Sequence, residues 1–133
     1  MSRPPEQIRE EFVRQWLLKA EEDLQAAQSL LACGTTFLAT VCFHSQQAAE
    51  KYLKAFLTRH QVEFPKTHDI GQLLDLIAPI DIDLSESLRD TIVLTAYGVG
   101  IRYPSDSPSV TASDAQQAVQ LADRVRRSIL DLL

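Results

Sequence analysis

One stretch of this chain decides the fold: residues 43–57, FHSQQAAEKYLKAFL. Apolar and small side chains within it and just before it recur at intervals of three and four: Leu38, Val41, Cys42, Ser45, Ala49, Tyr52, Leu53 and Phe56. This spacing places them on one face of an α-helix. The polar side chains of His44, Gln47, Lys51 and Lys54 fall on the opposite face. The stretch therefore predicts an amphipathic helix with one side in a core.

The rest of the chain continues the helical pattern. Before this stretch, apolar residues at similar spacing, from Val13 to Leu31, predict one face of a long helix that ends at Gly34. After it, Thr67 or Asp69 can cap a short helix that runs through Ile77. Residues 83–86 have the pattern of a capping box that opens a fourth helix, and residues 111–114 can cap a last one. Four long helices and one shorter helix predict an all-α, antiparallel up-and-down bundle.

Length and composition place the chain among ordinary globular proteins. With 133 residues, 45% hydrophobic and 23% charged, we expect a single domain over residues 1–133. The net charge of −5 disfavours bulk electrostatic binding of nucleic acid. No apolar run approaches the ~20 residues that span a bilayer, and no signal peptide is recognisable, so we expect a cytoplasmic protein without membrane contact.

No motif in the sequence indicates a metal site or a cofactor site. Cys33 and Cys42 are nine positions apart, which matches neither a redox pair nor a zinc ligand set, and we expect both to be small buried residues. The three histidines, His44, His60 and His68, lack the usual second ligand three or four positions away. We therefore predict no metal and no cofactor.

Polar side chains in three places suggest a ligand or partner surface. Gln47, Lys51 and Lys54 form a donor-rich strip along two turns of the second helix, able to bind a phosphate or an acidic partner. The competing interpretation is that Glu50 and Lys54 form an ordinary surface pair at i,i+4. Either way, the second helix carries the largest group of candidate residues.

The other two places lie near helix ends. Lys66 and His68 precede a helix start, where backbone N–H groups favour anions, although His68 can simply pack on the bundle end and donate to a carbonyl. Arg102 and Tyr103 close the fourth helix, where a cation meets the carbonyl end of the helix dipole. The simple helix-capping role of Arg102 competes with a role in binding a carboxylate or phosphate.

The phrases QQAAEKYLKA (46–55), KTHDI (66–70) and RYP (102–104), in this order, strongly resemble the HEPN family of small helical bundles. The resemblance covers about Phe12 to Leu130 in layout. It implies a bundle that often forms homodimers and is frequently encoded beside a minimal nucleotidyltransferase, as in toxin–antitoxin pairs. It also implies two competing activities: metal-independent RNA cleavage, or binding of nucleotides or partner proteins without cleavage.

The ribonucleases of that family carry an Arg-x(4 to 6)-His motif, which this chain lacks. Each histidine would need an arginine five to seven positions earlier, and those positions hold Phe-Leu-Ala (37–39), Leu-Lys-Ala (53–55) and Gln-Val-Glu (61–63). A composite site of His68 and Arg102 is the remaining route to catalysis, with the histidine as acid or base and the arginine stabilising charge on the phosphate.

The sequence thus predicts a non-catalytic HEPN module that binds a nucleotide or a cognate nucleotidyltransferase. The residues expected to do so are Gln47, Lys51, Lys54, Lys66, His68, Arg102 and Tyr103. One alternative is a metal-independent ribonuclease toxin with an irregular Arg102 and His68 site, and another is a homodimeric interaction adaptor. If a nucleotidyltransferase partner exists, Tyr103 is a conceivable acceptor for nucleotide transfer.

Overall fold

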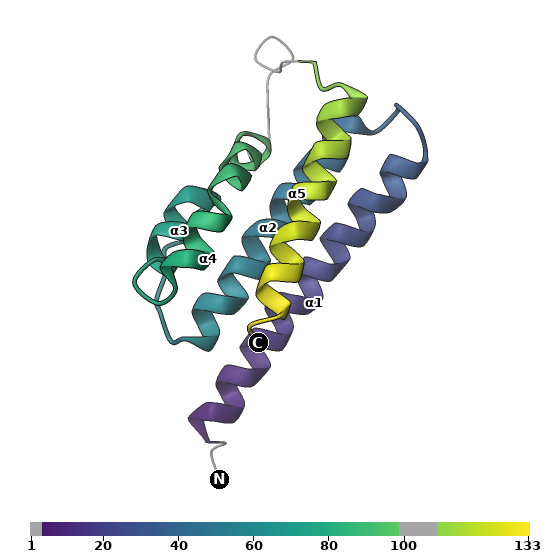
Figure 1. Cartoon of the computed structure of the whole chain (residues 1–133). Coiled ribbons are helices and arrows are strands. Elements are labelled where there is room, and N and C mark those ends of the chain that lie inside the picture. The colour runs from purple at the N-terminus through teal and green to yellow at the C-terminus, as the bar shows by residue number, and fades with distance from the viewer. Residues whose placement is uncertain (1–3, 99–108) are drawn as a thin grey trace.

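The computed structural model of the chain describes residues 4–98 and 109–133, and within them the ordered elements are helices, with no strand (Figure 1). The elements are α1 (Pro5–Ala32), α2 (Leu38–Arg59), α3 (Ile70–Ile77), α4 (Ile82–Ser87), the 3-10 helix η1 (Arg89–Tyr97) and α5 (Ala112–Leu130). The prediction of an all-α bundle is confirmed. No helix in these ranges is both long enough and apolar enough to cross a membrane.

Helix α2 is the centre of the bundle. It forms an antiparallel hairpin with α1 and packs against α5 on one side, while α3, α4 and η1 lie along its other side (Figure 1). Its inward stripe supplies the largest core side chains, Tyr52, Leu53 and Phe56, which are at most 2% exposed. Helix α2 contacts α1, α3, α5 and η1, so the pattern of its side chains constrains how nearly every other element packs.

Two of the predicted helix starts are confirmed by their caps. The Asp69 carboxylate accepts a hydrogen bond from the backbone N–H of Gln72 at the start of α3. At the start of α5, Thr111 and Asp114 form a reciprocal capping box, each side chain accepting from the other residue's backbone N–H. Hydrogen bonds from Thr111 hold the pKa of Asp114 below its ordinary value.

The fourth helix is built differently from the prediction. It starts at Asp81, whose side chain accepts from the Leu84 N–H, rather than at Asp83. It then stops after six residues, and η1 replaces the expected continuation. The hydroxyl of Thr91 donates to the Leu88 carbonyl at 2.6 Å, and such local side-chain bonds compete with regular α-helical pairing.

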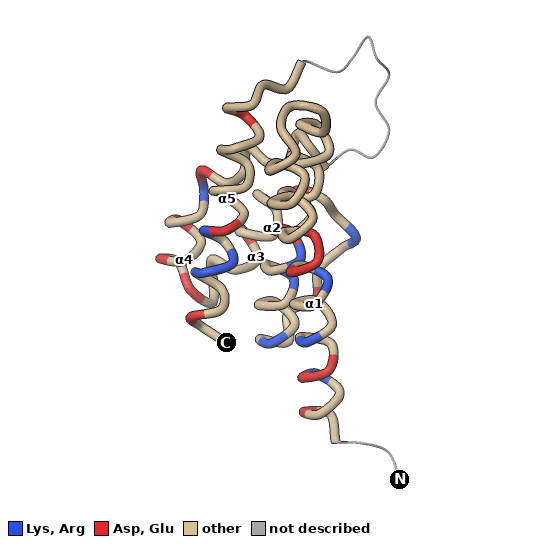
Figure 2. The backbone as a smooth tube through the Cα atoms, turned by 90° about the vertical axis from the view of Figure 1, so that its right-hand side faces the viewer, with Lys and Arg blue, Asp and Glu red and all other residues tan. Residues whose placement is uncertain are grey.

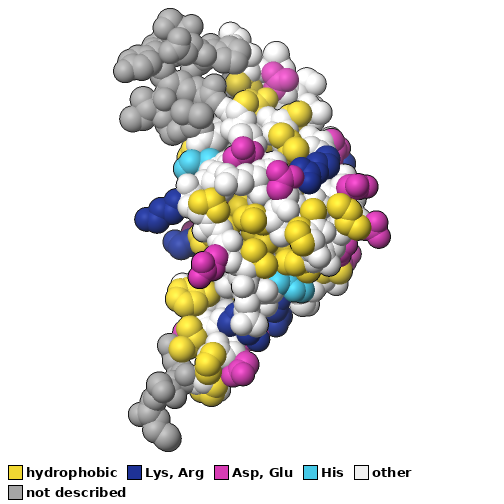
Figure 3. All heavy atoms as spheres, turned by 90° about the vertical axis from the view of Figure 1, so that its left-hand side faces the viewer, with side chains coloured by type: hydrophobic (Ala, Val, Ile, Leu, Met, Phe, Trp, Pro, Cys, Tyr) yellow, Lys and Arg dark blue, Asp and Glu magenta, His cyan; other side chains and the backbone are white. Residues whose placement is uncertain are grey.

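Two surface features lie away from the core. Helix α1 extends past the other helices at its N-terminal end (Figure 1), where Ile8 and Phe12 are 37% and 53% exposed. Hydrophobic side chains also gather on the face that holds α3, α4 and η1 (Figure 3), where Ile82 and Val93 are exposed. Cys42 is buried as expected, but Cys33 is exposed because α1 ends there, so its predicted burial is wrong.

Candidate functional site

A buried carboxylate, that of Glu50, is the centre of a polar network on α2. Its side chain is 3% exposed. One oxygen, Oε1, accepts from His68 Nδ1 at 2.7 Å, and Oε2 lies 3.4 Å from Lys54 Nζ. Gln46 Nε2 adds a longer contact of 3.4 Å to Oε1. A buried carboxylate is costly unless it is paired and hydrogen-bonded, and these three partners meet that requirement.

Lys54 lies inside the bundle wall rather than on its surface. Its side chain is 8% exposed, and Nζ lies 5.4 Å from the ring centroid of Trp16 and 5.7 Å from that of Phe64. The two rings favour a cation between them. The prediction that Glu50 and Lys54 form an ordinary surface pair is therefore wrong, because Trp16 of α1 and Phe64 of the α2–α3 loop cover the lysine.

Gln46 connects this network to two other parts of the chain. Its Nε2 donates to the His68 carbonyl at 3.0 Å, and its Oε1 accepts from Gln47 Nε2 at 2.7 Å. Gly98, at the end of η1, lies directly against the Gln46 amide. A Cβ added at Gly98 would be 2.8 Å from the amide carbon, so only glycine fits there without a shift of Gln46.

His68 is the exposed member of the network, with 65% of its side chain accessible. A carboxylate only accepts hydrogen bonds, so the contact with Glu50 places a proton on Nδ1 and leaves Nε2 as the ring nitrogen available to a ligand. The partner is thus a carboxylate and not the carbonyl considered for a purely structural His68. Lys66 is exposed two residues earlier, but the helix start that follows is already capped by Asp69.

A second network of the same type joins α2 to α1. Asp23 is 13% exposed, and its two oxygens accept from His44 Nδ1 at 2.8 Å and from Lys51 Nζ at 2.5 Å. Lys51 is therefore neutralised by Asp23 in the same way that Lys54 is neutralised by Glu50. Both lysines of the predicted donor-rich strip are thus paired within the fold.

A third cluster ties α5 to the hairpin. The Glu21 Oε1 atom accepts from the Tyr52 hydroxyl and from Arg126 Nε, both at 2.6 Å. Partial burial opposes ionisation of Glu21, but these two hydrogen bonds outweigh it and lower the carboxyl pKa. Burial first, and then the bond to Glu21, raises the pKa of Tyr52. The cluster connects the three long helices at the edge of the core, because Tyr52 is buried whereas Glu21 and Arg126 are each about one third exposed.

Comparison with known proteins identifies the family. The sequence model of the HEPN domain matches residues 13–132. This chain belongs to the HEPN domain family. Its structure also resembles that of TT1696 from Thermus thermophilus, with a TM-score of 0.73 and 36% sequence identity over 91% of this chain and 98% of that one.

A second solved structure supports the HEPN fold alone. ST0689, described as an archaeal HEPN homologue, has a TM-score of 0.69 and 24% identity over 90% of this chain and 96% of that one. No curated protein matches the chain significantly. The resemblance inferred from the three sequence phrases is thus confirmed at the level of the family.

The structure brings together part of the predicted HEPN site. Gln47, Lys54 and His68 belong to the Glu50 network, Lys51 belongs to the Asp23 network beside it, and Lys66 is exposed nearby. Arg102 and Tyr103 lie outside the described residues. Each of the long helices α1, α2 and α5 carries both basic and acidic residues (Figure 2).

Sequence reasoning missed the residues that organise the site: Asp23, His44, Gln46 and Glu50. The signal for two of them was present, because Gln46 and Glu50 are four residues apart within the phrase 46–55 and face the same side of α2. Asp23 gave no such signal. Within residues 4–98 and 109–133, no group of three His, Cys, Asp or Glu side chains is arranged to hold a metal ion.

Proposed function

We propose that this HEPN chain is a non-catalytic module that binds a nucleotide, either free or presented by a cognate minimal nucleotidyltransferase, at the face around His68. The proposal rests on the exposed imidazole of His68, which is hydrogen-bonded to the buried carboxylate of Glu50. Glu50 is 3% exposed, whereas His68 is 65% exposed. A side chain oriented in advance loses less entropy when it binds, which favours ligand binding at this position.

The chemistry of the face suits a nucleotide. His68 Nε2 can accept from a ribose hydroxyl or an amine, and a protonated ring can donate to a phosphate oxygen. Lys66 supplies an exposed cation two residues away. Arg102 and Tyr103 remain candidates from the sequence. The lack of the Arg-x(4 to 6)-His spacing favours binding without cleavage.

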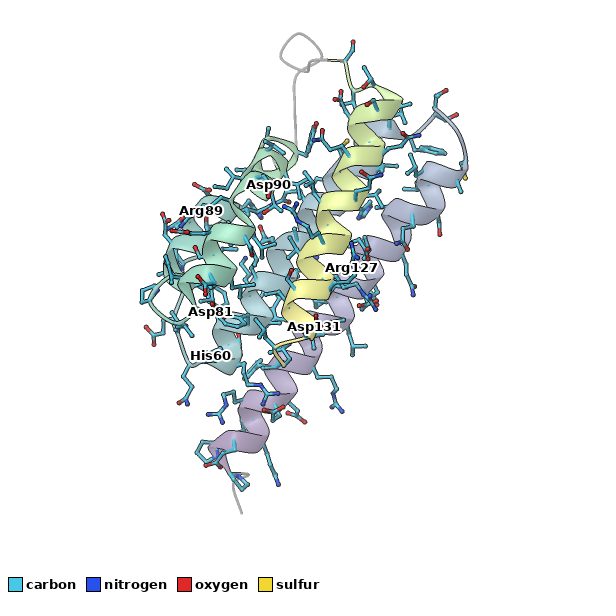
Figure 4. The ribbon with its side chains drawn as sticks, viewed as in Figure 1. His60, Asp81, Arg89, Asp90, Arg127 and Asp131 are labelled. Atoms are coloured by element: carbon cyan, nitrogen blue, oxygen red, sulfur yellow. The ribbon has the colours of Figure 1, made fainter. Side chains whose placement is uncertain are left out.

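Isothermal titration calorimetry with ATP, without added metal, tests this proposal. We expect wild-type protein to bind, and His68→Ala and Arg102→Ala to weaken the affinity at least tenfold, about 1.4 kcal/mol. His60→Ala is the matched control, because His60 is also exposed but caps the C-terminal end of α2 (Figure 4), ten residues after Glu50. Equal affinities of wild type and His68→Ala for ATP would refute the proposal.

The second candidate function is a metal-independent ribonuclease, favoured by the Glu50 and His68 pair. A carboxylate that fixes the tautomer of a histidine is a common arrangement for general acid–base catalysis. The sequence offers Arg102 as the second member of such a site, although it lies outside the described residues. Cleavage of labelled RNA in EDTA that disappears in Arg102→Ala would favour this function over binding alone.

A toxin–antitoxin role connects both candidates to a nucleotidyltransferase partner. A toxin would arrest growth on expression, and His68→Ala or Arg102→Ala would relieve the arrest. If the partner transfers a nucleotide to Tyr103, intact-mass analysis after incubation with such a partner and ATP will show one added nucleotidyl group that Tyr103→Phe abolishes. An unchanged mass would exclude this modification.

The third candidate is a homodimeric adaptor, favoured by the exposed end of α1. Ile8 and Phe12 lie beside a shallow groove that is also lined by Pro5, Thr58 and Gln61. Burial of these apolar side chains against a second copy would stabilise a dimer. Light scattering after size-exclusion chromatography should give twice the chain mass, and Phe12→Glu should give the mass of one chain. A wild-type monomer at all concentrations would contradict it.

A further inference from the structure

The stripe of α2 that holds Lys54, Glu50 and Gln47 continues beyond the Glu50 network toward the N-terminal end of the helix. Phe43 and His44 stand there, and their rings meet edge-on at a centroid distance of 5.5 Å and an angle of 75°. Phe43 is half-buried, yet it does not belong to the hydrophobic side chains that pack against the core in the described ranges. An aromatic ring that stays partly accessible at a helix surface can stack on a planar ligand.

A carboxylate orients the ring of His44, as Glu50 orients the ring of His68. In each network one carboxylate accepts from the Nδ1 atom of a histidine and forms an ion pair with a lysine: Asp23 contacts His44 and Lys51, and Glu50 contacts His68 and Lys54. The side chain of His44 is 29% exposed. The chain therefore presents two oriented imidazoles, one on each flank of the same stripe of α2.

The spacing along α2 fits one elongated ligand. Phe43 precedes Glu50 by seven residues, which is about 10 Å along a helix axis. Gln47 lies midway between them and reaches the Gln46 amide at 2.7 Å. The aromatic group is thus at one end of the stripe, and the exposed His68 and Lys66 are at the other. This length is comparable with that of an extended nucleoside triphosphate.

We propose that the nucleotide binds lengthwise along α2, with its base stacked on Phe43 beside the edge-on ring of His44 and its phosphates at His68. This inference rests on the proposed function and adds to it a base subsite that no sequence motif indicated. Aromatic faces bind bases by stacking, whereas the polar end supplies hydrogen bonds and positive charge. The two ends therefore recognise different parts of the ligand.

Titrations with two ligands distinguish the contribution of Phe43 to binding from that of His68. The ligands are ATP and inorganic tripolyphosphate, which has the phosphates but no base. We expect Phe43→Leu to weaken ATP about tenfold and to leave tripolyphosphate unchanged, and His68→Ala to weaken both. Leucine keeps an apolar side chain of similar volume, so the substitution removes mainly the aromatic ring.

The possible outcomes distinguish the inference from the proposed function. If Phe43→Leu binds ATP as wild type does while His68→Ala is weakened, the base subsite is refuted and the nucleotide function stands. If wild type binds neither ligand, both fail. A measurement without substitutions guards against misfolding of the variant: ATP should shift the ring proton resonances of Phe43 in wild-type protein, and unchanged resonances under saturating ATP would refute the subsite.

Discussion

Replacing Lys54 by methionine tests the claim that Glu50 is a buried, paired carboxylate. Methionine keeps the apolar stem between Trp16 and Phe64 but removes the ammonium 3.4 Å from Oε2. Removing one partner of a buried ion pair costs about 3–5 kcal/mol. The loss should be near the lower end, about 3 kcal/mol, because the His68 and Gln46 hydrogen bonds to Glu50 remain.

Urea unfolding provides the assay for this prediction. Trp16 is the only tryptophan, so its fluorescence reports unfolding from a position 5.4 Å from Lys54 Nζ. With a slope of about 1.5 kcal/mol per M, the midpoint should fall by about 2 M. The matched control is Lys19→Met on the exposed face of α1, which should leave the midpoint nearly unchanged.

A double variant separates the pair from the packing. In Glu50→Gln/Lys54→Met no buried charge lacks its partner, so we expect it to recover at least half of the stability that Lys54→Met loses. If the midpoint of Lys54→Met equals that of Lys19→Met, the reasoning about the buried pair is refuted. If the double variant is less stable than Lys54→Met, the unpaired carboxylate is not the cause of the loss.

Three further predictions concern other parts of the chain. Gly98→Ala should destabilise the fold by about 1–3 kcal/mol in thermal unfolding, because its methyl group meets the Gln46 amide; an unchanged melting temperature would contradict that contact. Burial raises the pKa of Cys42 to about 11, so at pH 8 a thiol reagent should label only the exposed Cys33 in native protein, and two fast-reacting thiols would refute this. Hydrogen bonds lower the pKa of Glu21 despite its partial burial. The stabilising contribution of Glu21 is therefore present above the ordinary carboxyl pKa and disappears as pH falls through the lowered value. The Glu21→Gln variant should melt below wild type at pH 7, and the difference between the two melting temperatures should be smaller at pH 3.

The sequence predicted the long helices because their apolar spacing is a local property. The stripe of α2 and the caps at Asp69 and Thr111 follow from rules that involve residues at most a few positions apart. The 3-10 helix η1 could not be predicted in the same way. Residues 89–97 have apolar residues at helical spacing, and hydroxyl bonds such as that of Thr91 decide the outcome only in the folded chain.

The candidate site was predicted in composition but not in arrangement. His68 and Lys54 were named from their phrases, but the burial of Lys54 depends on residues far from it in the chain. Trp16 and Phe64 bury Lys54, and they are 38 residues before it and 10 after it in sequence. Periodicity shows which side of a helix is polar, and it does not show whether another element covers that side.

The most direct test of the nucleotide-binding face is an NMR titration of the three histidine Cε1–H resonances of wild-type protein with ATP. We expect the His68 resonance to shift with a saturable dependence on ATP, the His44 resonance to shift with the same dissociation constant, and the His60 resonance to stay in place. Saturable shifts confined to His60, or no saturable shift at all, would contradict the claim that this HEPN chain binds a nucleotide through the imidazole held by Glu50.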